Sequence, residues 1–209
     1  MMASIRALWN DLIELRRDLV TSIILLAVGI FVGLTSSRLD AFLLAQIEPL
    51  RETVSRLEMM ENQQLWIFLF IFFNNFIKAL AVIFLGALLG VFPIVFLIIN
   101  GLMIGFVISW AERAGASMYE VIVLGLLPHG IVELSAILIA AAFGIRYGKL
   151  VFGAIWLRIR NATAEENDKV AVKLQAFHGK LGRLIGFLFL ALLLAAFIES
   201  TITFSLLRG

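Results

Sequence analysis

The chain has 209 residues, of which 62% are hydrophobic and 15% are charged, and its formal net charge is +2. Soluble globular proteins carry roughly 45–50% apolar and about 25% charged residues. A water-soluble fold of this size has too little interior for so many apolar side chains, so we expect the chain to lie in a lipid bilayer. The small net charge argues against nucleic-acid binding, and the absence of cysteine excludes disulfides, thiolate metal sites and thiol catalysis.

The first 18 residues predict an amphipathic helix. Apolar side chains recur there at every third or fourth position, with charged residues between them. Such a stripe is typical of a helix that lies along the membrane surface or against a partner helix. The apolar run over residues 19–35 then predicts a first span that is retained as an anchor, because this charged helix stands where a signal peptide would have a short basic start. The stripe consists of Ile5, Leu8, Leu12, Leu15 and Leu19.

Residues 19–209 predict one all-helical transmembrane domain with about five spans and two amphipathic extramembrane segments. The spans are recognised as apolar runs that approach or exceed the roughly 20 residues that a bilayer requires. The amphipathic segments keep helical spacing but carry many charges. The expected spans cover residues 19–35, 65–92, 93–110, 119–143 and 184–206, and the amphipathic segments cover residues 40–64 and 163–183.

Local signals mark the boundaries of these segments. Pro93 separates two apolar runs and predicts a tight hairpin that turns there. Pro49 predicts that the first amphipathic segment is interrupted or bent. Thr163, followed three residues later by Glu166, predicts a capping box at the start of a helix. Two Gly-x-x-x-Gly pairs predict close packing between helices; they are formed by Gly86, Gly90, Gly101 and Gly105.

The distribution of basic residues favours five spans over six. Residues 150–157 are apolar but too short to cross a bilayer alone, and whether they enter the membrane stays open. If they do not cross, residues 144–183 form one loop with eight Lys or Arg. Five spans place this loop on the same side as the basic N-terminal segment. The positive-inside rule then predicts a plasma-membrane protein with its N-terminus in the cytoplasm and its C-terminus outside.

Several polar side chains are predicted to lie within the spans, where each suggests a function by default. His129 and Glu133 are four residues apart on one helix face, so they could fill two metal positions or act as base and orienter. Intramembrane Asn, His and Glu often serve only as hydrogen-bond partners between helices, and this structural interpretation is weighed first. The candidate polar cluster consists of Asn74, Asn75, Lys78, Asn100, His129, Glu133, Glu199 and Thr203.

Four segments resemble the stage II sporulation protein M family. They are Phe73-Asn74-Asn75, Asn100-Gly101, Leu127-Pro128-His129-Gly130-Ile131-Val132-Glu133 and Phe197-Ile198-Glu199-Ser200-Thr201-Ile202-Thr203. The last one departs from the family pattern, because Phe204 stands where a proline often ends that motif. The resemblance implies an all-helical polytopic protein with about five spans. In the branch that gives the family its name, it implies a role in anchoring a peptidoglycan-degrading complex during spore engulfment.

The sequence favours a non-enzymatic integral membrane scaffold or membrane-organising protein. We expect a homo-oligomer in the lipid bilayer, in contact with other membrane or envelope proteins, with no nucleic acid and no cofactor. A transporter or channel with a polar intramembrane path is the first alternative. An intramembrane metal-dependent enzyme is the second, although it needs a third ligand or a nucleophile near His129 and Glu133.

Overall fold

The computed structural model describes residues 2–115, 117 and 127–203, and in this part of the chain it contains helices and no strands. Five of its helices, α2, α4, α5, α6 and α7, are long and apolar enough to cross a membrane. The predictions of an all-α fold and of five spans are therefore confirmed. The α-helices are α1 (Met2–Glu14), α2 (Arg16–Thr35), α3 (Asp40–Glu58), α4 (Gln63–Phe84), α5 (Val91–Arg113), α6 (Leu127–Ile159) and α7 (Ala164–Ile198).

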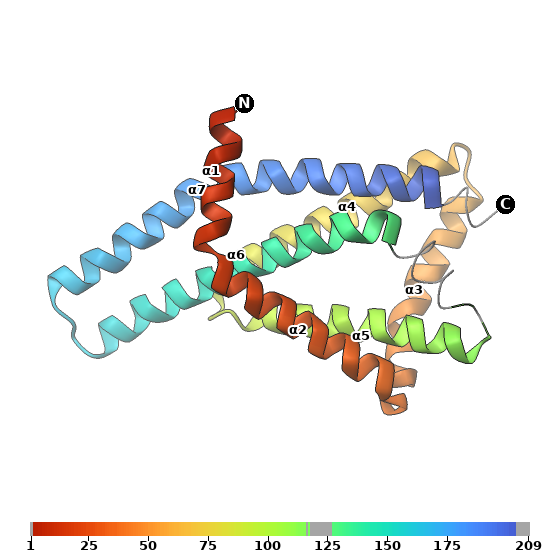
Figure 1. The fold of residues 1–209 in the computed structure, drawn as a ribbon, viewed down its shortest axis with the longest axis horizontal. Helices are drawn as coiled ribbons and strands as arrows, with labels where there is room; N and C mark the ends of the chain where they lie inside the picture. Colours follow the sequence, from red (N-terminus) through yellow and green to blue (C-terminus); the bar gives the residue numbers. More distant parts are fainter. Residues whose placement is uncertain (1, 116, 118–126, 204–209) are drawn as a thin grey trace.

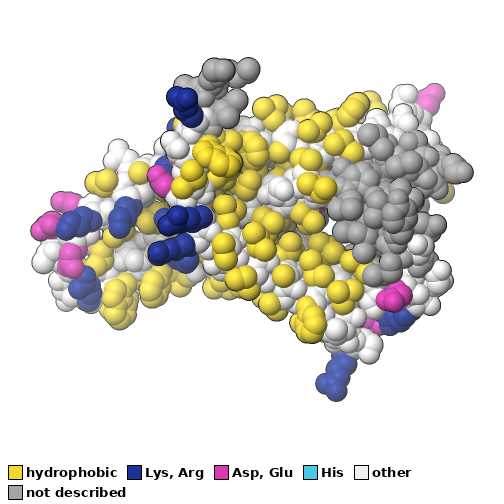
Figure 2. Space-filling model, in the orientation of Figure 1, with side chains coloured by type: hydrophobic (Ala, Val, Ile, Leu, Met, Phe, Trp, Pro, Cys, Tyr) yellow, Lys and Arg dark blue, Asp and Glu magenta, His cyan; other side chains and the backbone are white. Residues whose placement is uncertain are grey.

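The spanning helices run along a common direction, and α1 and α3 lie crosswise at opposite ends of this bundle (Figure 1). Figure 2 shows an apolar band over the bundle, whereas Lys and Arg side chains gather toward the end from which α6 and α7 project. Phe31, Ile77 and Leu190 are more than 60% exposed. In a membrane protein, apolar side chains that are exposed along a spanning helix face lipid. Helices α1 and α3 cross the ends of this bundle, where helices that lie on the membrane surface are found.

Glycines allow α2 and α5 to pack backbone against backbone. A Cβ atom on Gly101 would collide with the backbone of Leu26, Gly29 and Ile30 on α2, and Gly33 meets the backbone of Leu102 in the same way. Gly86 and Gly144 form a second close approach, between the α4–α5 connection and α6. The packing role predicted for these glycines is confirmed at Gly86, Gly101 and Gly105, whereas Gly90 lies in the turn between α4 and α5.

The hairpin between the second and third spans turns before the position predicted from Pro93. Helix α4 ends at Phe84, a 3₁₀ turn covers Leu85–Ala87, and α5 begins at Val91. Gly90 adopts a φ of 76° at the reversal, a conformation that glycine enters without steric cost. Pro93 instead lies buried in the first turn of α5, where its missing N–H has no partner within the helix to lose.

Helices α6 and α7 are each longer than the sequence predicted. The 33 residues of α6 span about 50 Å against a bilayer core of about 30 Å. The apolar segment 150–157 is part of this helix. Residues 119–126, with which the expected fourth span begins, lie outside the described residues. Helix α7 joins the amphipathic segment 163–183 to the last span. The two helices therefore form a hairpin whose turn projects beyond the other spans.

The capping and proline signals give different results. Helix α7 begins with the predicted capping box, in which the Glu166 backbone N–H donates to Thr163 Oγ1 (3.4 Å) and the Thr163 N–H donates to Glu166 Oε2 (3.2 Å). Helix α3, by contrast, runs through Pro49 without interruption, because a single proline removes only one backbone hydrogen bond from an exposed helix. Arg113 at the end of α5 pairs with Asp40 at the start of α3 at 2.7 Å, which ties this surface helix to the bundle.

Candidate functional site

A cavity of about 500 Å³ lies among α3, α4, α5, α6 and the π-helical turn Glu199–Thr203. The structure brings six of the eight predicted polar residues to its wall: Asn74, Asn75 and Lys78 from α4, Asn100 from α5, Glu133 from α6, and Glu199 from the π-helical turn. The side chains of His129 and Thr203 lie outside the part that the structure describes. Polar side chains that are spread over 126 positions of the sequence thus converge on one site.

The three asparagine amides of the cavity do not join helices together. Asn74 Nδ2 donates to the neighbouring Asn75 Oδ1 at 3.4 Å, and Asn100 Nδ2 donates to the Phe96 carbonyl of its own helix at 2.7 Å. Among the contacts of the described residues, none of these amides bonds to another helix. All three residues line the cavity, so hydrogen bonding between helices does not account for them.

Charges of both signs share the cavity. Glu133 lies within electrostatic range of Lys78 and of Glu199. An isolated charge in the middle of a bilayer costs about 2.5–3.5 kcal/mol on insertion scales, and it is offset by an opposite charge or by water in a cavity. Lys78 on α4 and Glu133 on α6 lie within electrostatic range of each other, although no direct ion pair joins them among the described residues.

Helix α3 contributes lining residues that the sequence did not assign to the site, namely Leu50, Val54 and Glu58. Leu50 and Val54 belong to the apolar stripe of the amphipathic segment 40–64. The periodicity of this stripe signalled a buried helix face, but it could not tell that this face covers a cavity between spans. The cavity thus has a polar wall inside the bundle and a partly apolar cover provided by a surface helix.

An apolar layer closes the cavity at its far end. Val82 follows Lys78 by one helical turn, Leu97 precedes Asn100 by one turn, and Ile137 follows Glu133 by one turn. Because α5 runs opposite to α4 and α6, all three lie on the side away from α3. They belong to one buried cluster, in which Val82 and Leu97 are 0% exposed. The polar groups therefore occupy the half of the bundle that α3 covers.

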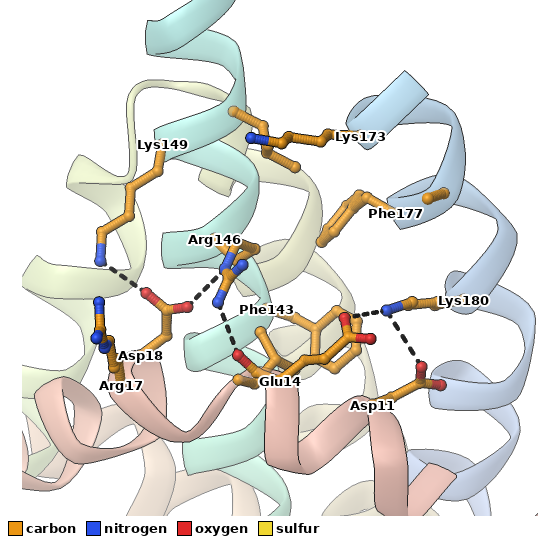
Figure 3. Close-up of a pocket in the computed structure, with 13 residues that line it drawn as sticks. Asp11, Glu14, Arg17, Asp18, Phe143, Arg146, Lys149, Lys173, Phe177 and Lys180 are labelled. Carbon is orange, nitrogen blue, oxygen red and sulfur yellow. Dashed lines mark hydrogen bonds and ion pairs between the residues drawn. The ribbon is translucent and has the colours of Figure 1, made fainter. Parts of the chain in front are cut away.

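A second charged cluster joins α1 and α2 to the projecting hairpin (Figure 3). Asp18 Oδ2 accepts from Arg146 Nε and Asp18 Oδ1 from Lys149 Nζ, both at 2.7 Å. Asp11 pairs with Lys180 at 3.3 Å and with Arg183 at 2.9 Å. From the sequence, the basic residues of segment 144–183 served only to orient the chain, so these pairs, which depend on contacts across more than 120 positions, were missed.

Within the described residues, no group of three or more His, Asp or Glu side chains is placed to hold a metal ion. The comparisons with known proteins point to a family. The chain matches the model of stage II sporulation protein M over residues 22–204, which is most of its length, and it belongs to this family. No curated protein and no solved structure matches it. The chain is a multi-pass membrane protein of this family.

Proposed function

We propose that this member of the stage II sporulation protein M family binds a small polar solute in the cavity under α3 and takes part in its transport, without catalysing a reaction. The observation that carries the proposal is the convergence of six intramembrane polar side chains on a cavity of about 500 Å³. Pockets of roughly 300–1,000 Å³ with a few convergent polar groups are typical of small-molecule sites. We therefore prefer transport to the scaffold role that the sequence favoured, and the cavity is the observation that supports this choice.

The lining defines the class of solute. Lys78 offers a cation, Glu133 and Glu199 offer carboxyl groups, and the asparagine amides both donate and accept hydrogen bonds. A solute with hydrogen-bonding groups of both kinds, such as a small zwitterion or a polyol, satisfies such a wall. Transport in addition requires that the apolar layer at Val82, Leu97 and Ile137 opens in a second conformation, as alternating access demands.

We also place the N-terminus in the cytoplasm, because the basic residues gather at the end of the bundle that carries α1 and the α6–α7 turn. With five spans, α3 then lies on the outer surface of the plasma membrane. The cavity faces outward in this arrangement, and the apolar layer separates it from the cytoplasm.

Single cysteines test whether the cavity holds water, because the chain has no cysteine of its own. With Asn100→Cys we expect labelling by a membrane-impermeant thiol reagent added on the α3 side. Leu97→Cys is the matched control within the same helix, since Leu97 is 0% exposed, and Ile99→Cys on the outer face, where Ile99 is 39% exposed, is the lipid-facing control. A thiol in an apolar environment does not ionise and reacts slowly. Labelling of Asn100→Cys no faster than that of Leu97→Cys would show a dry cavity and contradict the proposal.

A native mass spectrum of the protein in lipid nanodiscs tests solute binding. We expect a bound small molecule in the wild type and its loss in Glu133→Gln, which removes one charge of the wall while keeping its shape. Ser135→Ala is the control on the same helix, because Ser135 is exposed and donates to the Ile131 carbonyl of its own helix. Retention of the molecule in Glu133→Gln would place its site elsewhere.

A membrane-organising scaffold is the second candidate, and one observation favours it. The projecting part of α6 exposes an apolar stripe in which Phe152, Trp156 and Ile159 are 55%, 54% and 67% exposed. Such a stripe at the spacing of one helix face suits a second copy of the chain in a homo-oligomer. The same mass spectrum reports the subunit count. A bare oligomer with lipid alone, which dissociates in Trp156→Ser, would favour the scaffold over the transporter.

A further inference from the structure

A second pocket, with a volume of about 540 Å³, lies at the opposite end of the bundle from the polar cavity. It is enclosed by α1, the first turn of α2, α6 and α7 (Figure 3). Helix α2 begins its apolar run here, and α6 passes the α4–α5 turn at this level, where Gly148 packs against Gly90. The pocket thus lies where the spanning bundle ends and the projecting hairpin begins, which is where we expect lipid headgroups to surround a bundle of this length.

The wall of this pocket carries more positive than negative charge. Five bases face three acids: Arg17, Arg146, Lys149, Lys173 and Lys180 against Asp11, Glu14 and Asp18. The acids are engaged by Arg146, Lys149, Lys180 and by Arg183 beside the pocket. Arg17 and Lys173 form no ion pair with any described residue, and both are exposed. The acids therefore pair with basic residues of the same protein, and Arg17 and Lys173 are the two cations of the wall that could pair with a ligand.

Apolar side chains lie beside these cations. Leu15, Phe143 and Phe177 are between 1% and 5% exposed and line the same pocket. In Figure 3, Arg17 lies beside Lys149 on one side, and Lys173 reaches from α7 toward α6 on the other. A pocket that combines unpaired cations with buried apolar side chains suits an anionic headgroup that carries an apolar chain. Basic pockets between spanning helices bind such headgroups.

We propose that this pocket binds a phosphate group at the membrane surface, with Arg17 and Lys149, which lie side by side, as its donors and Lys173 on the opposite wall as a further positive charge. The guanidinium of Arg17 can donate two parallel hydrogen bonds to phosphate oxygens, and the ammonium groups act as point charges. The phosphate belongs either to an anionic phospholipid or to a free phosphate. This site is independent of the solute proposed for the polar cavity, because the two pockets have no lining residue in common.

The test uses the full chain in phosphatidylcholine nanodiscs, to which either phosphatidylglycerol or inorganic phosphate is added as the probe. Native mass spectrometry counts the retained probe in the wild type and in the double variant Arg17→Gln/Lys173→Gln. Neither side chain makes an ion pair in the described structure, so this variant keeps the contacts that hold α1. The control, Arg6→Gln/Arg158→Gln, removes the same charge from exposed residues at the same end of the protein that do not line the pocket.

We expect the double variant to retain its probe about thirtyfold less than the wild type, since each of the two basic residues contributes about 1 kcal/mol to the attraction of an anionic headgroup. The control should retain it as the wild type does. Selective loss of phosphatidylglycerol assigns the phosphate to a lipid, and selective loss of inorganic phosphate assigns it to a soluble anion. Equal retention of both probes in the two double variants would overturn the proposal.

Discussion

Replacing Gly101 with leucine is expected to separate α2 from α5 and to lower the midpoint of thermal unfolding in detergent by about 6 to 12 °C. The Cβ of any larger residue at this position meets the backbone of Leu26, Gly29 and Ile30 instead of a movable side chain. Backbone cannot yield by changing rotamer, so the helices must move apart along their whole contact. A strain of about 3 kcal/mol is the upper part of the range for overpacked cores.

The matched control for this substitution is Gly186→Leu. Gly186 lies in the membrane-spanning part of α7, and a Cβ atom there meets nothing within 4 Å. This variant adds the same side chain at an exposed position of a spanning helix without a collision, so its unfolding midpoint should stay within about 2 °C of the wild type. Equal midpoints for Gly101→Leu and Gly186→Leu would mean that the contact between α2 and α5 does not stabilise the folded protein.

The close packing of α2 and α5 also shows what the sequence could predict. Five spans follow from hydropathy, because a bilayer core imposes a length on every apolar helix that crosses it. The capping box at Thr163 and the packing glycines are local signals with a local physical cause. These features were recognised because each depends on residues within a few positions of one another.

The features that the sequence did not predict depend on contacts between distant segments. The reversal after α4 lies at Gly90 instead of Pro93, because glycine supplies the positive φ and proline fits the first turn of the next helix. Helix α6 continues through residues 150–157 and packs against α7, and no local pattern encodes this contact. The basic residues on either side of residues 150–157 suggested a loop, whereas in the structure they lie on or next to the projecting end of α6.

The candidate site was predicted in its residues but not in its shape. Placing a Lys, Glu or Asn side chain in a bilayer costs free energy, so such a residue within an apolar run is a clear signal in a sequence. Lys78, Glu133 and Glu199 could be selected for this reason. That they converge under α3, above an apolar layer, depends on how α3, α6 and the π-helical turn pack around the α4–α5 hairpin, which no local pattern encodes. The second pocket was missed because its key acids, Asp11 and Asp18, look like the polar face of an ordinary surface helix.

Replacing Asp18 with asparagine is expected to lower the unfolding midpoint in detergent by about 4 to 8 °C, the second largest effect proposed here. The Asp18 side chain is 2% exposed and holds Arg146 and Lys149 together. The variant leaves Arg146 without its buried countercharge. Removing one partner of a fully buried pair costs about 3–5 kcal/mol, and we expect about 2 kcal/mol because water screens the half-exposed partners.

Two further variants separate this ion pair from a general effect of charge. Glu52→Gln removes a carboxylate from an exposed pair on α3, where Arg56 and Glu52 lie 3.8 Å apart, and should change the midpoint by less than about 2 °C. In Asp18→Asn/Arg146→Gln the cation is removed together with the acid, so part of the lost stability should return, as coupled sites require. A double variant as unstable as the sum of its two single variants would show that Asp18 and Arg146 stabilise the protein separately and would contradict this prediction.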